Sequence, residues 1–445
     1  MELIHNGIIV NEGTAQRGFI VINGGYIARV GTGDASQELI DVCDTVTDAQ
    51  GAYVIPGVID DHVHMREPGL THKATMASES RAAVAGGITS VMDMPNVKPT
   101  TTTSEAIAHK MDIARESSMV NYSFYIGATN DNIDTLNGID YSRVCGVKVF
   151  MGSSTGGMLV NDATALRRIF KEINAVIAVH CEDEDIIARN RQDMKDKHGD
   201  NLPVTMHTSI RSEEACYKST ETAVRLAQEC HTRLHVLHIS TARELELFST
   251  KQPNITCEAC VGHLWFCDND YDRLGNRIKV NPSIKTASDR EALRKAVSNG
   301  VINLIATDHA PHLLSEKQGN CITAASGMPL AQFSLITMME MVEQGIFTVE
   351  TIVERMCHAP ARLFGIDRRG FLRPGYHADI AIVQRCETPH TVTDDDVLSL
   401  CGWTPLAGTQ LHHQVIATYV NGTKAWDNGT IADEPCGTPL KFIKN

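Results

Sequence analysis

The feature that most constrains the fold is a repeated alternation of short apolar runs with longer helix-like segments through the middle of the chain. The apolar runs have the length and composition of buried strands. There are eight of them, at residues 58–62, 88–92, 122–128, 146–150, 175–180, 234–239, 254–258 and 302–308. Helix-like segments fill most of the gaps, at residues 73–86, 104–117, 163–174, 212–230 and 288–299. This alternation predicts an α/β fold, a (β/α)8 TIM-type barrel.

An open, doubly wound sheet is the alternative, and the third connection (residues 129–142) has only weak helical character. The ends of the strands favour the barrel. Five strands end in or near a side chain that can bind a metal, namely His62, His64, Lys148, His180, His238 and Asp308. In a barrel the carboxyl ends of all strands open on one face, so these six side chains would converge. An open sheet would spread them along an edge.

Strand-like segments also occur at both ends of the chain. Residues 2–10 and 18–31 precede the barrel pattern, and residues 378–384 and 412–426 follow it. We therefore expect one small β-sandwich domain built from the N- and C-terminal segments. The expected division is 1–54 and 366–445 for this domain and 55–365 for the barrel.

The overall charge limits the class of partner. The formal net charge is −14 at pH 7, which argues against nucleic acid or an anionic membrane surface. A small anionic substrate would still fit, provided that the site has local positive charge.

The N-terminus has no signal-peptide pattern, and no apolar run approaches the ~20 residues of a membrane span.

The 13 cysteines are scattered, which predicts reduced thiols and a cytoplasmic protein. Cys257 and Cys260 form a CxxC pair. A structural zinc site there is disfavoured, because no second pair lies near it.

The spacing of His62 and His64 predicts a metal site. Residues i and i+2 of a strand point to the same side, so both imidazoles can reach one ion. Either histidine alone would more often be an ordinary core or surface residue. Imidazole and carboxylate ligands together favour zinc or a related transition metal.

Lys148 and Asp308 can each be interpreted as an ordinary structural residue or as a functional one. Lys148 could be an ordinary strand lysine. A lysine desolvated beside cations loses its proton more easily, however, and a free amine can react with CO2 to give a carbamate that bridges two metals. Asp308 could be a turn or helix-capping residue, but beside the other five it is the favoured general base.

Three motifs carry a resemblance to a known family: DDHVHMREPG (60–69), GVKVFMGSSTG (146–156) and ATDHAPHLLSEK (306–317). They resemble the signatures of the cyclic amidohydrolases, most closely the dihydroorotases, and the resemblance runs along almost the whole chain. It implies two zinc ions. His62, His64 and Asp308 would hold one, and His180 and His238 the other. Carboxylated Lys148 and a hydroxide would bridge them.

The resemblance also implies a substrate. Arg66 lies two residues beyond His64, so its guanidinium can offer a planar fork to a carboxylate on the same side. In the family, Arg66, Asn96 and His312 hold the carboxylate of L-dihydroorotate. Asn281 and the backbone around Ser326 and Gly327 would face the ring, although this chain reads NPSIK where relatives often read NPPLR.

The implied reaction is the reversible hydrolysis of L-dihydroorotate to N-carbamoyl-L-aspartate, a step of pyrimidine biosynthesis. The bridging hydroxide would attack the ring amide, with Asp308 as general base and acid. One alternative is an allantoinase or a hydantoinase/dihydropyrimidinase, whose substrates lack the carboxylate and which typically have no arginine at the position of Arg66. The other is a non-catalytic scaffold relative. Such relatives typically lose metal ligands, whereas all six are present here.

Further expectations concern partners and loops. We expect a homo-oligomer such as a dimer. Some members of the family associate with aspartate carbamoyltransferase, but nothing in this sequence indicates that partner. Residues 183–211 and 259–287 are expected to be loops over the site, and residues 312–329 are expected to form a lid.

Overall fold

The computed structural model describes residues 1–152 and 157–443. Its centre is an eight-stranded sheet in which every neighbouring pair is parallel and the strands follow chain order. The strands are β6 (Val58–Val63), β7 (Ile88–Asp93), β8 (Asn121–Gly127), β9 (Gly146–Phe150), β10 (Ile177–His180), β11 (Leu234–Val236), β12 (Ile255–Cys260) and β13 (Leu304–Ala306).

The sheet closes on itself where its first and last strands meet. Val63 forms a parallel bridge with His309, and the His64 amide donates to the His309 carbonyl across 2.7 Å. The (β/α)8 barrel is therefore confirmed, and the open sheet is excluded.

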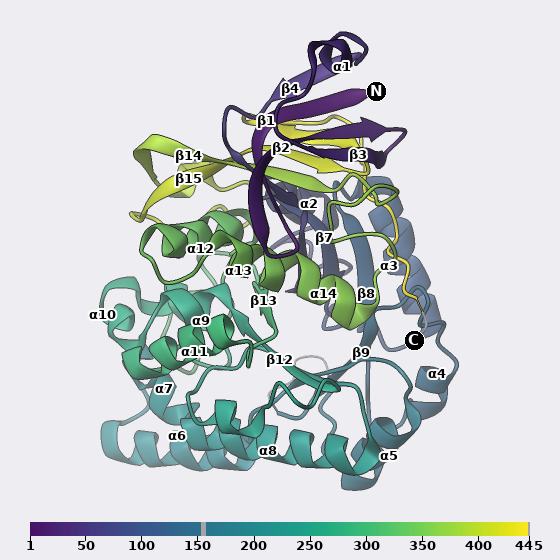
Figure 1. The fold of residues 1–445 in the computed structure, drawn as a ribbon. Coiled ribbons are helices and arrows are strands. Elements are labelled where there is room, and N and C mark those ends of the chain that lie inside the picture. The colour runs from purple at the N-terminus through teal and green to yellow at the C-terminus, as the bar shows by residue number, and fades with distance from the viewer. Residues whose placement is uncertain (153–156, 444–445) are drawn as a thin grey trace.

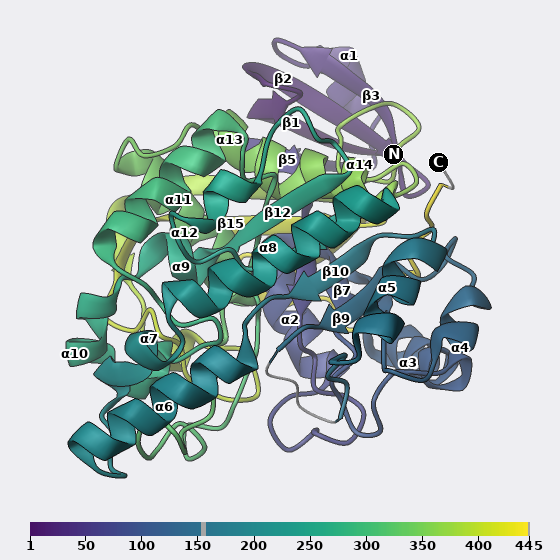
Figure 2. The same ribbon diagram turned by 90° about the horizontal axis from the view of Figure 1, so that it is seen from below.

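Helices pack around the barrel (Figure 2). The five expected helices are α2 (Met76–Ala85), α3 (Ser104–Ser117), α5 (Ala163–Glu172), α8 (Glu213–Cys230) and α11 (Ala287–Asn299). Each begins after a Ser, Thr or Asp whose side chain accepts from a first-turn amide, which explains where the helix starts. The weak third connection holds only the short helix α4 (Ile133–Asn137). No helix within the described ranges is long and apolar enough to cross a membrane.

The expectation of a loop at residues 183–211 is wrong. The stretch holds α6 (Glu184–His198), a 3₁₀ turn (Val204–Met206) and α7 (His207–Ile210). Asp183 caps α6, and acids in the first turn and bases in the last suit the helix dipole. Residues 259–287 contain only short pieces, α9 (Val261–Trp265) and α10 (Tyr271–Leu274) with two 3₁₀ turns, and residues 312–329 contain no helix or named strand.

The two ends of the chain form one hydrogen-bonded sheet of nine strands, placed together at one end of the molecule (Figure 1). Antiparallel pairing of β5 with β14 joins the N- and C-terminal parts. The strands are β1 (Glu2–Asn11), β2 (Thr14–Asn23), β3 (Tyr26–Thr32), β4 (Thr45–Asp48), β5 (Tyr53–Pro56), β14 (Ile380–Thr391), β15 (Gln410–Val420), β16 (Thr423–Asp427) and β17 (Thr430–Ile431).

This sheet folds over its own apolar core. Strands from both termini contribute to one buried cluster that includes Ile20, Ile380 and Tyr419. The Tyr419 hydroxyl lies 2.9 Å from Thr47 Oγ1 and 2.7 Å from Glu2 Oε1, although β15 pairs with neither β4 nor β1. Strands from opposite parts of the sheet thus face each other.

Three helices lie between this sheet and the barrel (Figure 1). They are α12 (Ser334–Glu343), α13 (Val349–Val353) and α14 (Ala359–Phe364).

Candidate active site

One cavity of about 610 Å³ contains every site residue that the sequence predicts. Its lining includes His62, His64, Arg66, Asn96, Lys148, His180, His238, Asn281, Asp308, His312, Ser326 and Gly327. A larger cavity of about 840 Å³ along residues 438–443 contains none of them. The barrel therefore brings the predicted residues together at the carboxyl ends of its strands. Residues 153–156 of the GVKVFMGSSTG motif lie outside the described residues.

The first group of candidate ligands is His62, His64 and Asp308, which lie on or just after the first and last strands of the barrel. Asp308 Oδ1 lies 3.1 Å from His64 Nε2 and 3.3 Å from His62 Nε2. One ligand atom from each of these residues falls within 4.8 Å of the others. Asp308 has a positive φ of 48°, a conformation that costs of order 1 kcal/mol and recurs at functional sites.

The second group comes from the neighbouring strands. His180 Nδ1 lies 2.9 Å from His238 Nε2, and the two rings meet edge to face. The ring centroids of His238 and His62 are 5.3 Å apart, so the two groups adjoin. Lys148 lies in the same cavity with its ammonium 4.7 Å from the Phe150 ring centroid.

Lys148 is buried and has no ion-pair partner among the described residues. Only 1% of the residue is exposed, and Nζ forms no ion pair or hydrogen bond with the residues that the structure describes. Burial is the main cause that lowers the pKa of Lys148 to about 8. The free amine is therefore accessible near neutral pH, as a reaction with CO2 requires.

Carboxylates behind the site orient two of the imidazoles. His62 Nδ1 lies 2.6 Å from Glu258 Oε1, and His180 Nε2 lies 3.0 Å from Glu182 Oε2. Arg211 pairs with Glu182 in turn. Such partners fix the ring tautomer and raise the basicity of a ligand nitrogen. No sequence pattern assigned either glutamate to the site, although each follows a predicted strand or lies on one.

The charge states suit a divalent cation. Burial is the main cause that lowers the pKa of His64 to about 4, which keeps this imidazole neutral. Burial opposes the ionisation of Asp308, but the neighbouring His62 and His64 lower its pKa to about 2. Burial opposes the protonation of His62, but Asp308 and Glu258 raise its pKa, so a metal ion would displace a proton from this ring. Neutral imidazoles and an ionised carboxylate are the forms that bind metal. The residues therefore fit the metal ions that the sequence predicts.

Positive charge gathers on another side of the cavity. Arg66, which is 6% exposed, donates from Nε to the Pro311 carbonyl across 3.0 Å. Its Nη2 lies 3.2 Å from His312 Nε2. Lys73 and Lys98 line the same cavity and were missed by the sequence analysis. This side can accept a small anion such as a carboxylate.

A tightly held loop forms a further wall. Gly327 has a φ of 145°, and a Cβ at this position would lie 2.5 Å from the Ala310 carbonyl, so the backbone requires glycine. The buried Lys317 ammonium donates to the carbonyls of Lys279, Ala325 and Gly327 at 2.8–2.9 Å. The cavity-lining Asn281 Oδ1 is buried and has no hydrogen-bond partner in the described part of the chain.

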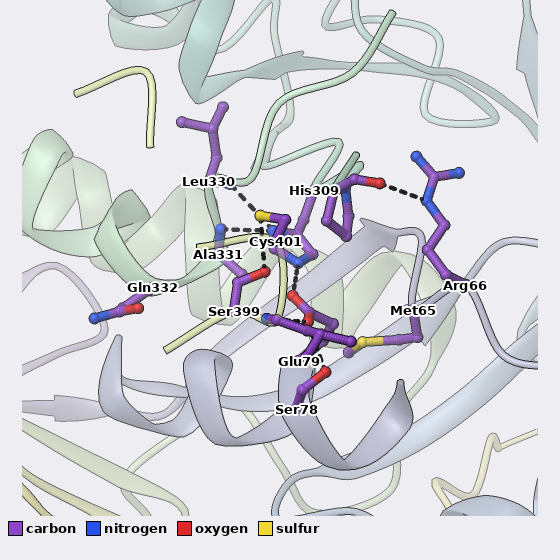
Figure 3. A network of polar contacts seen from close by, with 12 residues as sticks. Met65, Arg66, Ser78, Glu79, His309, Leu330, Ala331, Gln332, Ser399 and Cys401 are labelled. Atoms are coloured by element: carbon purple, nitrogen blue, oxygen red, sulfur yellow. Dashed lines mark hydrogen bonds and ion pairs between the residues drawn. The ribbon is translucent and has the colours of Figure 1, made fainter. Parts of the chain in front are cut away.

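A buried network supports the loop that carries Asp308 (Figure 3). The next residue, His309, lies between a carboxylate and two backbone amides. Its Nε2 is 2.7 Å from Glu79 Oε2, and its Nδ1 accepts from the amides of Leu330 and Ala331 at 3.1 and 3.2 Å. These contacts fix the ring orientation and the adjacent backbone.

Comparison with known proteins defines the family. Residues 53–424 match the amidohydrolase family model. The chain is 34% identical over 394 residues to a dihydroorotase of Halobacterium salinarum, covering 86% of this chain and 89% of that one. It is 31% identical over 440 residues to a dihydroorotase of Lactobacillus gasseri, covering 96% and 99%. The chain belongs to the amidohydrolase family.

Solved structures agree on the architecture. An L-hydantoinase (dihydropyrimidinase) from Arthrobacter aurescens matches with a TM-score of 0.92 at 26% identity, over 99% of both chains. A dihydropyrimidinase from Brevibacillus agri matches with a TM-score of 0.89 at 22% identity, over 100% of this chain and 98% of that one. The second match bears on the fold alone.

Proposed function

We propose that this protein is a dihydroorotase, which hydrolyses the cyclic amide of L-dihydroorotate to N-carbamoyl-L-aspartate and runs in reverse during pyrimidine biosynthesis. The observation that carries the proposal is the position of Arg66. Its buried guanidinium lines the same cavity as the candidate metal ligands. The full-length similarity to dihydroorotases supports the same conclusion.

The proposed cofactor is a pair of zinc ions. His62, His64 and Asp308 would hold one ion, and His180 and His238 the other. Bound zinc would polarise the amide carbonyl and lower the pKa of the attacking water.

Lys148 would bridge the ions as a carbamate. Its neutral amine forms an N–C bond with CO2 and releases one proton, leaving an anion with two oxygens. The lowered pKa of Lys148 supports this step, because more of the amine is free near neutral pH.

The catalytic proton is assigned to Asp308. Its lowered pKa keeps the carboxylate ionised, so it can accept a proton from the attacking water. The same carboxyl group then delivers that proton to the ring nitrogen as the C–N bond breaks. Ring closure uses these transfers in the opposite order.

Other chain groups would orient the substrate. Arg66, Asn96 and His312 are proposed to hold the carboxylate, and charge-assisted hydrogen bonds make such contacts strong. Asn281 Oδ1, which has no hydrogen-bond partner among the described residues, can accept a hydrogen bond from a ring N–H. The backbone at Ser326 and Gly327 would face the rest of the ring.

A hydantoinase or dihydropyrimidinase is the second candidate, favoured by the 0.92 TM-score to a hydantoinase. A hydantoin or dihydrouracil ring need not carry a carboxylate. Buried Arg66 would then face no anion, which is costly for a charged group. We therefore rank this activity second.

We also propose the division into residues 1–54, 55–365 and 366–445, a cytoplasmic location and a homo-oligomer such as a dimer. All 13 cysteines are free, which supports a reducing compartment.

The decisive experiment is a substrate panel on zinc-loaded protein, with L-dihydroorotate, allantoin, hydantoin and dihydrouracil. We expect turnover of dihydroorotate alone. Arg66→Gln should raise the KM for dihydroorotate about tenfold or more, as the loss of a charge-assisted contact implies. Arg115→Gln, which removes an exposed arginine on α3, is the matched control. Turnover of an uncharged ring in place of dihydroorotate would overturn the assignment.

A further inference from the structure

Lys73 lines the cavity, but the proposed reaction gives its side chain no role. It lies in the segment between β6 and α2, and 12% of its side chain is exposed. Its ammonium lies 3.0 Å from His312 Nδ1 and 2.9 Å from Glu316 Oε1. The ion pair with Glu316 holds the ammonium against the imidazole.

The contact with Lys73 decides which ring nitrogen of His312 carries a proton. An ammonium has three donors and no acceptor, so it can bond only to a nitrogen with a free lone pair. Burial first, then Arg66, Lys73 and Lys317, lower the pKa of His312 far below its usual value, although a hydrogen bond with the Ser326 backbone raises it. The ring is therefore neutral and has one proton. With the lone pair on Nδ1, that proton is on Nε2.

Glu316 could in principle select the other tautomer, because its Oε2 is an acceptor 3.5 Å from His312 Nδ1. That separation is too long for a good N–H···O bond. The same oxygen already accepts from the Leu313 amide at 2.9 Å. The 3.0 Å contact with Lys73 therefore dominates at Nδ1.

The consequence lies on the other side of the ring. His312 Nε2 is 3.2 Å from Arg66 Nη2, and a guanidinium is also a donor without an acceptor. Two N–H groups that face each other cannot form a hydrogen bond. A carboxylate oxygen beside them can accept from both. If the proton were on Nδ1, Arg66 would donate to Nε2 and the pair would satisfy itself without a ligand.

We propose that Lys73 is a positioning residue that selects the Nε2–H tautomer of His312 and so keeps His312 and Arg66 as paired donors for the substrate carboxylate. The identity of the anion rests on the proposed function. The choice of tautomer does not, because it follows from the contacts that the His312 ring makes within the protein.

The first test measures the tautomer directly. Long-range ¹H–¹⁵N spectra of zinc-loaded protein that is deuterated except at its histidines distinguish protonated from unprotonated ring nitrogens, and loss of a signal in His312→Gln assigns it. We expect the Nε2–H tautomer in the wild type. Lys73→Met removes the donor at similar length and should shift His312 toward Nδ1–H. Lys73→Gln keeps a donor and should retain Nε2–H.

The second test separates substrate binding from turnover. Lys73→Met should raise the KM for dihydroorotate about tenfold, the size expected for one charge-assisted hydrogen bond, with kcat changed less than about threefold. Lys73→Gln should recover most of the loss. Lys171→Met is the matched control, since it removes an exposed lysine on α5, away from the residues that line the cavity.

Each outcome has a defined meaning. An unchanged His312 tautomer in Lys73→Met would overturn the proposal, and so would an equal KM increase in Lys171→Met. If the wild type does not turn over dihydroorotate, the proposed function fails, while the ring spectra still judge the action of Lys73 on His312.

Discussion

His62 and Glu258 form a short contact in the barrel interior, with 2.6 Å between Nδ1 and Oε1. Glu258 is ionised, because His62 and His235 lower its pKa although burial opposes this. An ionised carboxylate only accepts, so His62 Nδ1 carries a hydrogen. Burial opposes a second proton on the ring, but Asp308 and Glu258 raise the pKa of His62, and its Nε2 lies 3.3 Å from Asp308 Oδ1. A metal ion at this site would take the place of that second proton.

Glu258→Gln should weaken metal binding. The amide can still accept from His62, but it no longer raises the basicity of the ring, so we expect a 10- to 100-fold loss of zinc affinity. Competition with a chromophoric chelator measures this. Glu244→Gln is the control, since Glu244 is equally buried but bonds to Thr220 and Thr241. Unchanged affinity in Glu258→Gln would contradict the orienting role.

Lys148→Ala should lose the metal pair. Without the amine the proposed carbamate cannot form, so we expect metal content and turnover to fall together. Short carboxylic acids such as acetate or propionate should restore part of both, because they supply two oxygens in the space that the side chain leaves. Metal analysis before and after adding the acid makes the measurement. Full metal content in the variant without added acid would remove Lys148 from the ligand set.

Asp308→Asn should separate binding from catalysis. The amide keeps the shape of the side chain but cannot accept the proton from water at neutral pH, so kcat should fall about 10²- to 10⁴-fold. Some metal should remain, because His62 and His64 are intact. Steady-state kinetics and metal analysis on the same sample provide the measurement. Near-normal kcat would rule out Asp308 as the general base.

The sequence predicted the barrel and the candidate metal ligands because both follow from local patterns, whereas most of the substrate-facing residues were implied by the resemblance to a known family. Eight apolar runs defined the strands, and His62 and His64 lie two residues apart at the end of one. Glu258 and Lys73 could not be found in this way. Glu258 contacts His62 although it lies 196 residues further along the chain. The proposed role of Lys73 depends only on its contact with His312. Contacts of this kind depend on closure of the barrel, which no local pattern contains.

The missed helix α6 has a different cause. Only Ile186 and Ile187 are buried in its 15 residues, so the apolar periodicity that predicts helices is weak. The capping Asp183 and the change from acidic to basic residues along the segment were readable signals. They would have predicted a polar helix.

His207 gives the fold a dependence on pH that is separate from the metal ligands. It lies on α7, is buried, and donates from Nε2 to the Val280 carbonyl across 2.8 Å. Burial, and to a lesser extent the nearby Arg211 and Lys279, lowers the pKa of His207 to about 3. In the unfolded chain the pKa is about 6.5. Between these values the unfolded state binds more protons, so stability rises with pH and is lost as pH falls below about 6.5.

The size of the effect follows from the same difference. From pH 7 to pH 5, His207 should remove about 2 kcal/mol of the free energy of unfolding, since one pKa unit corresponds to about 1.4 kcal/mol. His207→Gln keeps a donor for Val280 but does not titrate, so its unfolding free energy should fall less over this range. Urea unfolding at the two pH values measures both proteins. His109→Gln, at an exposed site on α3, should behave as the wild type. Equal pH dependence of His207→Gln and the wild type would show that His207 is also neutral in the unfolded chain or charged in the folded one.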